Sequence, residues 1–464
     1  MSSQVTQQSE NLYSRIKELL EQGEVAEAMA LIEGEPIDTA FARTLLSHAR
    51  KFHVSGHLAE QKRICEIILA HLPGEYEALH LLGFYAQTCG DYALAERYYK
   101  QALAGNPGFA FSQLALAQLR MMQTGFREGR TEYEARFEAV TEGSGPDWRG
   151  LPYPRWCGKS VTGKKLYLWA EQGLGDIVMF AGFLPALLAQ RPERIALGMF
   201  PKLISLFTRS FPNIAIEPID EAAMHALAPT MLGAFPQIEA LASQIPVPFS
   251  LDPLRASYDY AKSHGLFDIA APMGDLLVHL MPDYLPARQP PYLVADPVRV
   301  EEVRQKLASL GPGKRIGISW YTSNMRETTR TIPLADMLPL LRMPDCHFIS
   351  LQHHVARAEI EHFCKENGCT IITDVAADLT QDAEALAALI DAMDEVVTID
   401  NSNVHLAGAL GVKTTLLLPK GSNYRWPEQA DDSTLWYKSV TALRQKELSN
   451  WREIIAFLID NFQK

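Results

Sequence analysis

Four glycines recur at nearly equal intervals along the N-terminal third of the chain. Gly23, Gly56, Gly90 and Gly125 are 33, 34 and 35 residues apart. Glycine suits a tight turn between helices, and a period near 34 residues is typical of proteins built from repeated helix pairs. A helical bundle without repeats gives no reason for this spacing. The sequence therefore predicts an α-solenoid at the N-terminus.

Residues 74–107 match one class of helical repeat closely. Their sequence, GEYEALHLLGFYAQTCGDYALAERYYKQALAGNP, has small, aromatic and proline residues where a 34-residue tetratricopeptide repeat needs them. Small residues let two helices approach, Tyr99 fills the gap between repeats, and Pro107 ends the second helix. Pro73 precedes Pro107 by 34 residues. We therefore expect tetratricopeptide repeats over residues 1–142.

Beyond residue 142 the sequence changes character. A Gly/Pro-rich stretch, TEGSGPDWRGLPYPRWCGK, reads as a linker, and a second Pro-rich stretch lies at 283–297. After each linker, short apolar runs alternate with helical stretches, which implies right-handed crossovers and parallel sheets. We expect two Rossmann-like domains, 143–296 and 297–464, that face a cleft. The expected strands are 165–171, 194–200, 214–219, 315–320, 347–352, 370–374, 395–400 and 414–419. A terminal helix near 447–462 is expected to pack across the first of these domains.

The balance of charges excludes two classes of partner. The chain has 43 Lys and Arg against 55 Asp and Glu, a net charge of −12. Affinity for nucleic-acid backbones and anionic membranes comes mainly from clustered cations. We therefore expect no nucleic-acid surface and no anionic-membrane surface, although a local basic pocket is compatible with this charge.

Three further features favour a cytoplasmic protein without a transmembrane segment. The first residues, MSSQVTQQ, lack the basic-then-apolar profile of a signal peptide. The most apolar stretch, 177–189, has 13 residues including a glycine and a proline, and is too short to cross a bilayer. The six cysteines are scattered without a Cys-x-x-Cys pair, so the sequence indicates neither a zinc site nor a disulfide framework.

The first α/β domain carries Gly173-Leu-Gly175-Asp176 between an expected strand and an apolar helix. Parallel sheets bind ligands at the loops that follow their strands, and the glycines allow a tight turn and close backbone approach. Asp176 is either a helix cap or a reactive carboxylate, and the motif alone does not decide. Glu171, at the strand end in a less polar setting, is a second candidate for the reactive carboxylate.

In the second α/β domain, EVVTIDNSNVHLAGALGVKTTLLLP contains a buried strand, a polar turn and a helix of small residues. The free N–H groups and the dipole of that helix form an anion site of the kind that phosphates need. His405 could donate to a phosphate oxygen, and Asp400 could hold a sugar hydroxyl or orient the loop; purely structural roles for both stay open. The candidate ligand-binding residues of this turn are Asp400, Asn401, Ser402, Asn403, Val404 and His405.

A third polar segment follows the first strand of the second α/β domain. It leaves the carboxyl end of that strand, so we expect it at the same sheet edge as Asp400; the alternative is a solvated surface loop. Arginine suits bidentate recognition of phosphate. Arg425, in Tyr-Arg-Trp after the strand ending near 419, adds a cation to this edge. The candidates in the loop are Thr322, Ser323, Asn324 and Arg330.

Several segments together carry a family resemblance. They are WAEQGLGDIVMFAGFLPALL, RTIPL (330–334), FISLQ (348–352), DNSNVHLAGAL (400–410) and YRW (424–426). In this order they resemble bacterial tetratricopeptide proteins fused to a glycosyltransferase similar to the heptosyltransferase-like family 9 enzymes. FREGRTEYEARF (126–137) resembles the segment that joins repeats to catalytic domain in those proteins, and the match covers most of 74–430. The chain departs from the family in Asn401-Ser-Asn403, where Thr/Ser-Gly/Ala-type residues are usual, and in Tyr321-Thr322, where Ala-Gly is common.

The resemblance implies a helical solenoid followed by two Rossmann-like domains in a GT-B arrangement. It also implies a nucleotide-sugar donor held mostly by the C-terminal domain, and an inverting, metal-independent reaction without a bound cofactor. Asp176 matches the family's base, Asp400, Asn403 and His405 match the loop that faces the donor, and Gln352 lies in a matching segment. The chain contains no Asp-x-Asp pair, which argues against a metal-clamped diphosphate.

The expected acceptor is a protein, for example flagellin or another bacterial surface protein, held on the concave face of the repeats. Two alternatives stay open. One is a transferase that acts on lipopolysaccharide or another glycan, with the repeats assembling partners. The other is a non-catalytic scaffold that keeps a vestigial donor cleft. The sequence names neither the sugar nor the acceptor.

Overall fold

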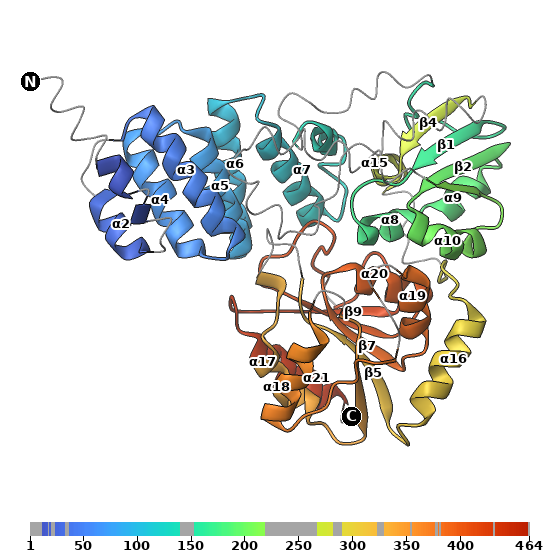
Figure 1. The fold of residues 1–464 in the computed structure, drawn as a ribbon. Helices are drawn as coiled ribbons and strands as arrows, with labels where there is room; N and C mark the ends of the chain where they lie inside the picture. The colour runs from blue at the N-terminus through green and yellow to red at the C-terminus, as the bar shows by residue number, and fades with distance from the viewer. Residues whose placement is uncertain are drawn as a thin grey trace, which may run out of the picture.

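The computed structural model shows a helical part followed by two α/β parts (Figure 1). It describes residues 12–16, 18–19, 24–32, 37–139, 153–218, 267–281, 290–322, 329–352, 355–375, 379, 382–429 and 432–462. Several segments named above lie outside these residues. They are the linker around residues 143–152, residues 283–289 of the second Pro-rich stretch, and the candidates Ser323 and Asn324. None of the described helices has both the length and the apolar character that a bilayer crossing requires.

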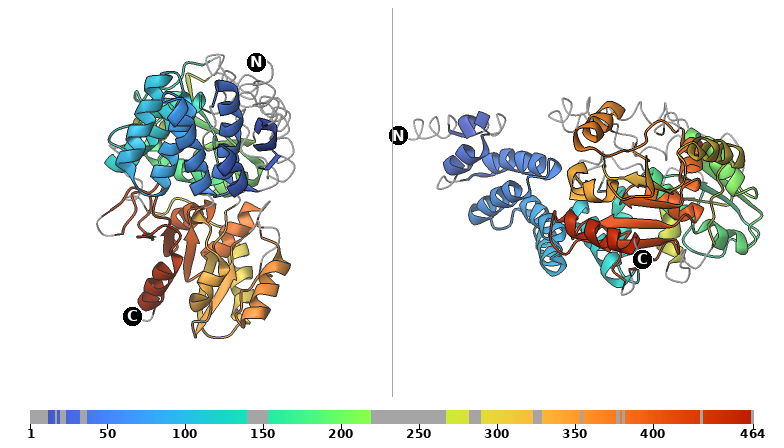
Figure 2. Two further views of the ribbon diagram at one scale, coloured as in Figure 1. Left: turned by 90° about the vertical axis from the view of Figure 1, so that its left-hand side faces the viewer. Right: turned by 90° about the horizontal axis from the view of Figure 1, so that it is seen from below.

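The N-terminal part consists of helices joined by short turns. The elements are α2 (Val25–Ile32), α3 (Thr39–Val54), α4 (Leu58–His71), α5 (Tyr76–Thr88), α6 (Tyr92–Gly105), α7 (Ala110–Thr124) and the 3₁₀ helix η1 (Glu132–Phe137). Helices α2–α4 project away from the α/β parts, whereas α7 lies beside them (Figures 1 and 2).

The periodic glycines stand at the ends of helices. Gly56, Gly90 and Gly125 follow α3, α5 and α7 and take positive φ angles of 79°, 78° and 58°. Side chains with a Cβ rarely adopt this conformation, so glycine allows each helix to end in a sharp turn. The predicted glycine turns are confirmed at these three positions, and Gly23 lies outside the described residues. The assignment of the helices to tetratricopeptide repeats stays a prediction.

Tyr99 packs inside a helix pair. A Cβ on Gly83 of α5 would lie 2.5 Å from Cε1 of Tyr99 on α6. The fully buried ring therefore fills the space that the glycine leaves, and its hydroxyl donates to Gln87 Oε1 at 3.0 Å. These contacts of Tyr99 lie within the pair α5–α6 of residues 74–107, whereas the sequence predicted a contact between repeats.

The first α/β part contains a four-stranded parallel sheet of order β3-β2-β1-β4. Its strands are β1 (Lys165–Trp169), β2 (Arg194–Met199), β3 (Ala215–Pro218) and β4 (Ile269–Pro272). Its helices are α8 (Leu174–Ala181), α9 (Leu184–Ala189), α10 (Ile204–Ser210) and α15 (Gly274–Leu280), with η3 (Pro201–Leu203). Three of these strands were expected from the sequence. Strand β4 was not predicted, because its sequence, Ile-Ala-Ala-Pro, is short and has weak strand propensity.

The second α/β part contains a five-stranded parallel sheet of order β6-β5-β7-β8-β9. Its strands are β5 (Lys314–Ser319), β6 (Cys346–Ser350), β7 (Glu395–Ile399), β8 (Thr414–Leu418) and β9 (Val440–Arg444). Its helices are α16 (Pro297–Ala308), α17 (Leu334–Leu341), α18 (Arg357–Asn367), α19 (Ala383–Asp391), α20 (Ser402–Leu410) and α21 (Trp451–Phe462). Two parallel sheets flanked by helices agree with the predicted α/β class.

Two expectations for the second α/β part are wrong. The segment 370–374 makes only an isolated bridge between Ile349 and Ile372, while the missed strand β9 occupies the opposite sheet edge. The terminal helix α21 packs on α17 of its own part, not on the first α/β part. Its buried face, with Trp451 and Leu458, belongs to the hydrophobic core that includes Ile316 of β5. The sequence predicted the terminal helix but not the surface against which it packs.

The helical part contacts both α/β parts directly. Arg130, between α7 and η1, donates from Nη1 to the carbonyl oxygens of Val278 (2.6 Å) and Met281 in the first α/β part. Gly421, just after β8, lies so close to the end of α5 that a Cβ would be 2.0 Å from the Gln87 carbonyl oxygen. The helices therefore brace the two α/β parts at once.

We expect Gly421→Ala to lower the free energy of unfolding by about 1–3 kcal/mol, because its methyl group would overlap backbone oxygens of Gln87 and Thr88. Gly74→Ala is the matched control, since a Cβ there has no neighbour within 4 Å. Denaturant unfolding of both variants measures the difference. Equal stability of the two variants would show that the packing at Gly421 relaxes at no cost.

Candidate functional site

The N-terminal ends of α8 and α20 meet where the two α/β parts join. A Cβ on Gly175 of α8 would lie 2.8 Å from Cδ2 of His405 and 3.5 Å from Cα of Ser402, both on α20. Each helix follows the carboxyl end of a central parallel strand, the usual place for ligand sites in such sheets. The sequence predicted that Gly175 allows close approach to the backbone. In the structure, the element that approaches Gly175 closely is α20.

Asp176 has two sets of partners. Its Oδ2 accepts the N–H of Gly173 at 3.2 Å, which caps α8. Its Oδ1 accepts both Nε (2.7 Å) and Nη2 (2.5 Å) of Arg425, which belongs to the second α/β part. The capping role left open by the sequence is therefore present, and an ion pair between the two α/β parts is present as well.

Asp400 is buried directly after β7 and is held by two side chains. Its Oδ2 accepts Nη1 of Arg330 at 2.7 Å and Nδ2 of Asn423 at 2.6 Å. Burial works to raise the pKa of Asp400, but the charges of Arg330 and Arg425 outweigh it and hold the pKa below its ordinary value. Asp400 is therefore ionised, and its two side-chain partners fix the orientation of its carboxylate at the carboxyl end of β7.

Arg330 binds Asp400 twice. Besides its bond to the carboxylate, Nη1 donates to the Asp400 carbonyl oxygen at 2.7 Å. Only 10% of the Arg330 side chain is exposed. Arg330 thus lies at the same sheet edge as Asp400, as the sequence predicted. Its guanidinium neutralises the Asp400 carboxylate.

His405 lies between aromatic neighbours in the first turn of α20. Its Nδ1 is 2.9 Å from the hydroxyl of Tyr437, and its ring stacks on Trp426 with centroids 5.2 Å apart. Burial lowers the pKa of His405 to about 4, although Asp400 opposes this shift. The imidazole is therefore neutral at pH 7, and it can donate a hydrogen bond without contributing positive charge.

The polar turn before α20 is held by its own amides. Asn401 Oδ1 accepts the N–H of Asn403 at 3.0 Å, and Asn401 Nδ2 donates to Ser319 Oγ at 2.7 Å. Asn403 Nδ2 donates to the Leu351 carbonyl oxygen at 3.2 Å, while Val404 is fully buried. These residues tie the turn to the ends of β5 and β6, so they position the N-terminus of α20.

Two other candidates hold the loop after β5. Gln352 Oε1 accepts the backbone N–H groups of Trp320 (3.3 Å) and Tyr321 (3.0 Å). The N–H of Thr322 donates to Thr331 Oγ1 at 3.3 Å. Both contacts shape this loop, and they account for Gln352 and Thr322 without a ligand.

Glu171 is committed to a buried ion network. Its Oε1 accepts Arg136 Nη2 at 3.1 Å and the N–H of Gly274 at 2.6 Å, and its Oε2 accepts Arg136 Nε at 3.3 Å. Arg136 Nη2 also donates to Asp275 Oδ1 at 2.7 Å. Both oxygens of Glu171 are thus occupied, as both oxygens of Asp176 are. The two carboxylates differ in position, because Asp176 lies at the junction of α8 and α20, whereas Glu171 faces Arg136 and the start of α15.

Several residues at this edge escaped the sequence analysis. Asn423 and Tyr437 contact Asp400 and His405 respectively, and Arg136 neutralises Glu171. Asn423 lies two positions before Arg425, so the polar stretch around Tyr-Arg-Trp was a usable signal. Tyr437 and Arg136 lie far along the chain from the groups they contact, and no sequence spacing marks them.

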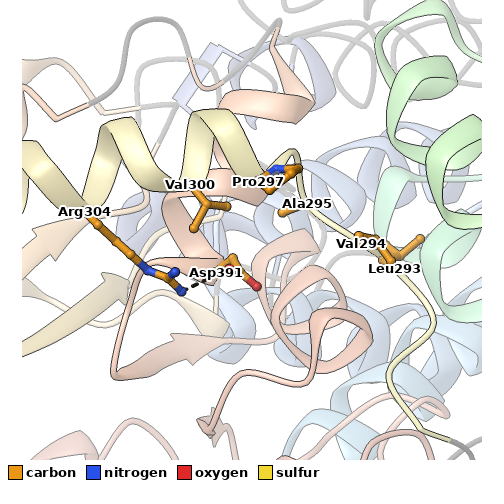
Figure 3. A pocket seen from close by; sticks show the side chains of 7 residues that line it. All are labelled: Leu293, Val294, Ala295, Pro297, Val300, Arg304 and Asp391. Atoms are coloured by element: carbon orange, nitrogen blue, oxygen red, sulfur yellow. Dashed lines mark ion pairs between the residues drawn. The ribbon is translucent and has the colours of Figure 1, made fainter.

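Two surface hollows lie away from this edge, and the first is beside α16. It has a volume of about 240 Å³ and lies beside α16 and the chain leading into it (Figure 3). Its lining is mainly aliphatic, and its polar groups are Arg304 and Asp391, whose ion pair measures 3.5 Å. A second hollow lies between α17 and α21. The second hollow is lined by Asp336 of the first turn of α17, which is paired with Arg452. Neither hollow is lined by a site residue predicted from the sequence.

No metal centre is evident in the part of the chain that the structure describes. There, no three His, Cys, Asp or Glu side chains come together as a metal ion would need. The charged groups at the α8–α20 junction instead neutralise one another in Arg–Asp pairs.

Comparisons with known proteins give a distant likeness. No known protein-family profile matches the chain. Protein FlbA of Caulobacter vibrioides is 30% identical over 364 residues, which are 77% of this chain and 56% of that protein. The chain thus spans just over half the length of this relative, whose name states no activity.

Solved structures include glycosyltransferases at low similarity. The glycosyl transferase family 9 from Veillonella parvula is 12% identical, with a TM-score of 0.42, over 66% of this chain and 90% of that one. The E. coli ADP-heptose LPS heptosyltransferase II is 14% identical, with a TM-score of 0.39, over 64% and 99%. The O-GlcNAc transferase of Thermobaculum terrenum is 15% identical, with a TM-score of 0.28, over 90% and 89%. At this level of similarity, function has to be argued from the side chains.

We expect Glu171→Gln to lower the free energy of unfolding by about 1–3 kcal/mol, because it leaves a buried Arg136 bond weakened or unmade. Glu132→Gln is the control, since its pair with Arg120 is half exposed and contributes little. Equal unfolding midpoints and slopes for the two variants in urea would contradict a structural role for Glu171.

We expect the His405→Asn variant to lose less free energy of unfolding on acidification than the unchanged protein does. The folded-state pKa of His405 is about 4, below the ordinary 6.5, so the unfolded state binds more protons between these values. Stability is therefore lost as pH falls from 6.5 toward 4, by about 2 kcal/mol at pH 5 from this residue. Unfolding free energies at pH 7 and pH 5 test this, with the exposed His71→Asn as control. An unchanged pH slope in His405→Asn would contradict the assignment.

Proposed function

We propose that the chain is an inverting, metal-independent glycosyltransferase that moves a sugar from a nucleotide-sugar donor to an acceptor hydroxyl. The observation that carries this proposal is the meeting of α8 and α20, which brings the Asp176 carboxylate to the N-terminus of the helix after Asp400. A base on one side and an anion-binding helix end on the other are what such a transfer needs. The sequence resemblance to family 9 transferases supports the same conclusion.

In the proposed reaction, Asp176 accepts the proton of the acceptor hydroxyl. The acceptor oxygen then forms a bond to the anomeric carbon from the face opposite the leaving group. The bond between that carbon and the phosphate oxygen breaks, and the nucleotide leaves with the electron pair. The N–H groups at the start of α20 and the Arg425 guanidinium stabilise its phosphates, which takes the place of a metal ion.

The donor is proposed to bind mainly to the second α/β part. Asp400 is held by Arg330 and Asn423, so one carboxylate face is fixed and can orient a sugar hydroxyl. The neutral imidazole of His405 can donate to a phosphate or sugar oxygen. Asn401 and Asn403 fix the turn between them, which keeps the N–H groups of α20 pre-organised for the donor.

The acceptor is proposed to be a protein bound by the helical part. Stacked helix pairs suit the binding of a polypeptide, and α7 and η1 join the helical part to the α/β parts through Met122 and Arg136. A transferase for lipopolysaccharide or another glycan would need no such surface.

Binding of a panel of nucleotide sugars, read as a rise in melting temperature, tests the donor site, because any bound ligand stabilises the fold by mass action. A non-catalytic scaffold would show no turnover with any donor.

We expect Asp176→Asn to keep the fold but lower turnover by about 10²–10⁴, the usual contribution of a general base. Asp296→Asn is the matched control, because Asp296 also caps a helix, α16, but lies away from the junction. Release of nucleotide from the best-bound donor measures turnover for both variants. A normal rate in Asp176→Asn, together with a folded protein, would leave Asp176 as a helix cap only.

A further inference from the structure

Arg425 is anchored in one α/β part and reaches into the other. Its N–H donates to Asn423 Oδ1 at 3.0 Å, and its carbonyl oxygen accepts Nε1 of Trp436 at 2.6 Å. Its guanidinium lies 4.9 Å from the ring centre of Tyr424 and ends on Asp176 of α8. The backbone of Arg425 is thus fixed to the second part, while its charged end closes the contact with the first.

The ion pair occupies the oxygen that a base would use. Both Nε and Nη2 of Arg425 donate to Oδ1 of Asp176, and Oδ2 accepts the N–H of Gly173. Each carboxylate oxygen offers about two lone-pair sites, so Oδ1 is filled, whereas Oδ2 keeps one site beside the Gly173 N–H. An acceptor hydroxyl cannot give its proton to Oδ1 until the guanidinium moves away.

Among the residues that the structure describes at this junction, Arg425 is also a cation well placed for the donor phosphates. Arg330 already makes two bonds to Asp400, and the His405 imidazole is neutral at pH 7. A departing nucleoside diphosphate needs positive charge near the start of α20, and guanidinium groups bind phosphate oxygens with two parallel bonds. The same guanidinium therefore has two competing anions, the Asp176 carboxylate and the donor phosphate.

We propose that Arg425 is a positioning residue that couples donor binding to the release of the base. The donor diphosphate draws the guanidinium from Asp176 to its phosphate oxygens, and Asp176 then becomes open to the acceptor hydroxyl. The donor binds first and the acceptor second. This inference rests on the proposed function.

The test uses the competition between the two anions. The probe is the nucleoside diphosphate, among ADP, GDP, UDP and CDP, that the full chain binds best in titration calorimetry. Asp176→Asn removes the competing charge, so this nucleotide should bind roughly tenfold more tightly, the scale of one charge-assisted hydrogen bond. Arg425→Gln should bind it roughly tenfold more weakly. In the double variant, Asp176→Asn should give no gain, because the gain acts through Arg425.

Controls separate the possible outcomes. Asp296→Asn should leave nucleotide affinity unchanged, and Arg425→Lys, which keeps the charge, should lie between the full chain and Arg425→Gln. Unchanged or weaker binding in Asp176→Asn, in a variant with a normal melting temperature, overturns the coupling but leaves the donor site standing. An equal gain from Asp176→Asn with and without Arg425 overturns it as well. If no nucleoside diphosphate binds the full chain, the proposed function itself fails, and the inference fails with it.

Discussion

The buried guanidinium of Arg136 has to meet carboxylates, and this requirement fixes how the helical part contacts the first α/β part. Only 6% of this side chain is exposed, and a charge in that position has to be neutralised. Burial works against its charge, but the carboxylates of Glu171 and Asp275 raise the pKa of Arg136. These partners come from the end of β1 and the start of α15, whereas Arg136 ends the helical part. The helical part is therefore attached to the first α/β part by charge as well as by apolar packing.

A second arginine extends this network. Arg155 donates to Asp275 through Nε (2.7 Å) and Nη2 (2.5 Å), and to Glu134 through Nη2 at 2.8 Å. Two arginines thus share three carboxylates, so each guanidinium is paired and one negative charge is left over. Removal of any one member would leave another buried charge without a full set of partners, which is more costly than losing an exposed pair.

The helical part also sets the position of the segment that carries Arg425. The hydroxyls of Tyr133 and Tyr424 are 3.0 Å apart, and Phe126 packs edge-to-face on Trp436 with ring centres 5.3 Å apart. Because Tyr424 directly precedes Arg425, contacts from the helices reach the pair between Arg425 and Asp176. A chain that lacked the helices would expose this aromatic surface and Glu171, so the helical part is integral to the junction of the two α/β parts.

Sequence by itself determined the local features of this protein. The glycine period placed helix turns, the alternation of apolar runs placed most strands of two parallel sheets, and Gly-x-Gly-Asp and Asp400 marked the strand ends that meet. These are properties of short segments, where backbone sterics and hydrophobic patterning act within a few residues. Only the tertiary structure decided which carboxylates are neutralised and by which cations. Glu171 and Asp176 both follow the strand β1, yet they have different partners. Glu171 pairs with Arg136, 35 residues earlier, and Asp176 pairs with Arg425, 249 residues later. Coulomb interactions between side chains depend on distance in space, and spacing along the chain does not encode that distance.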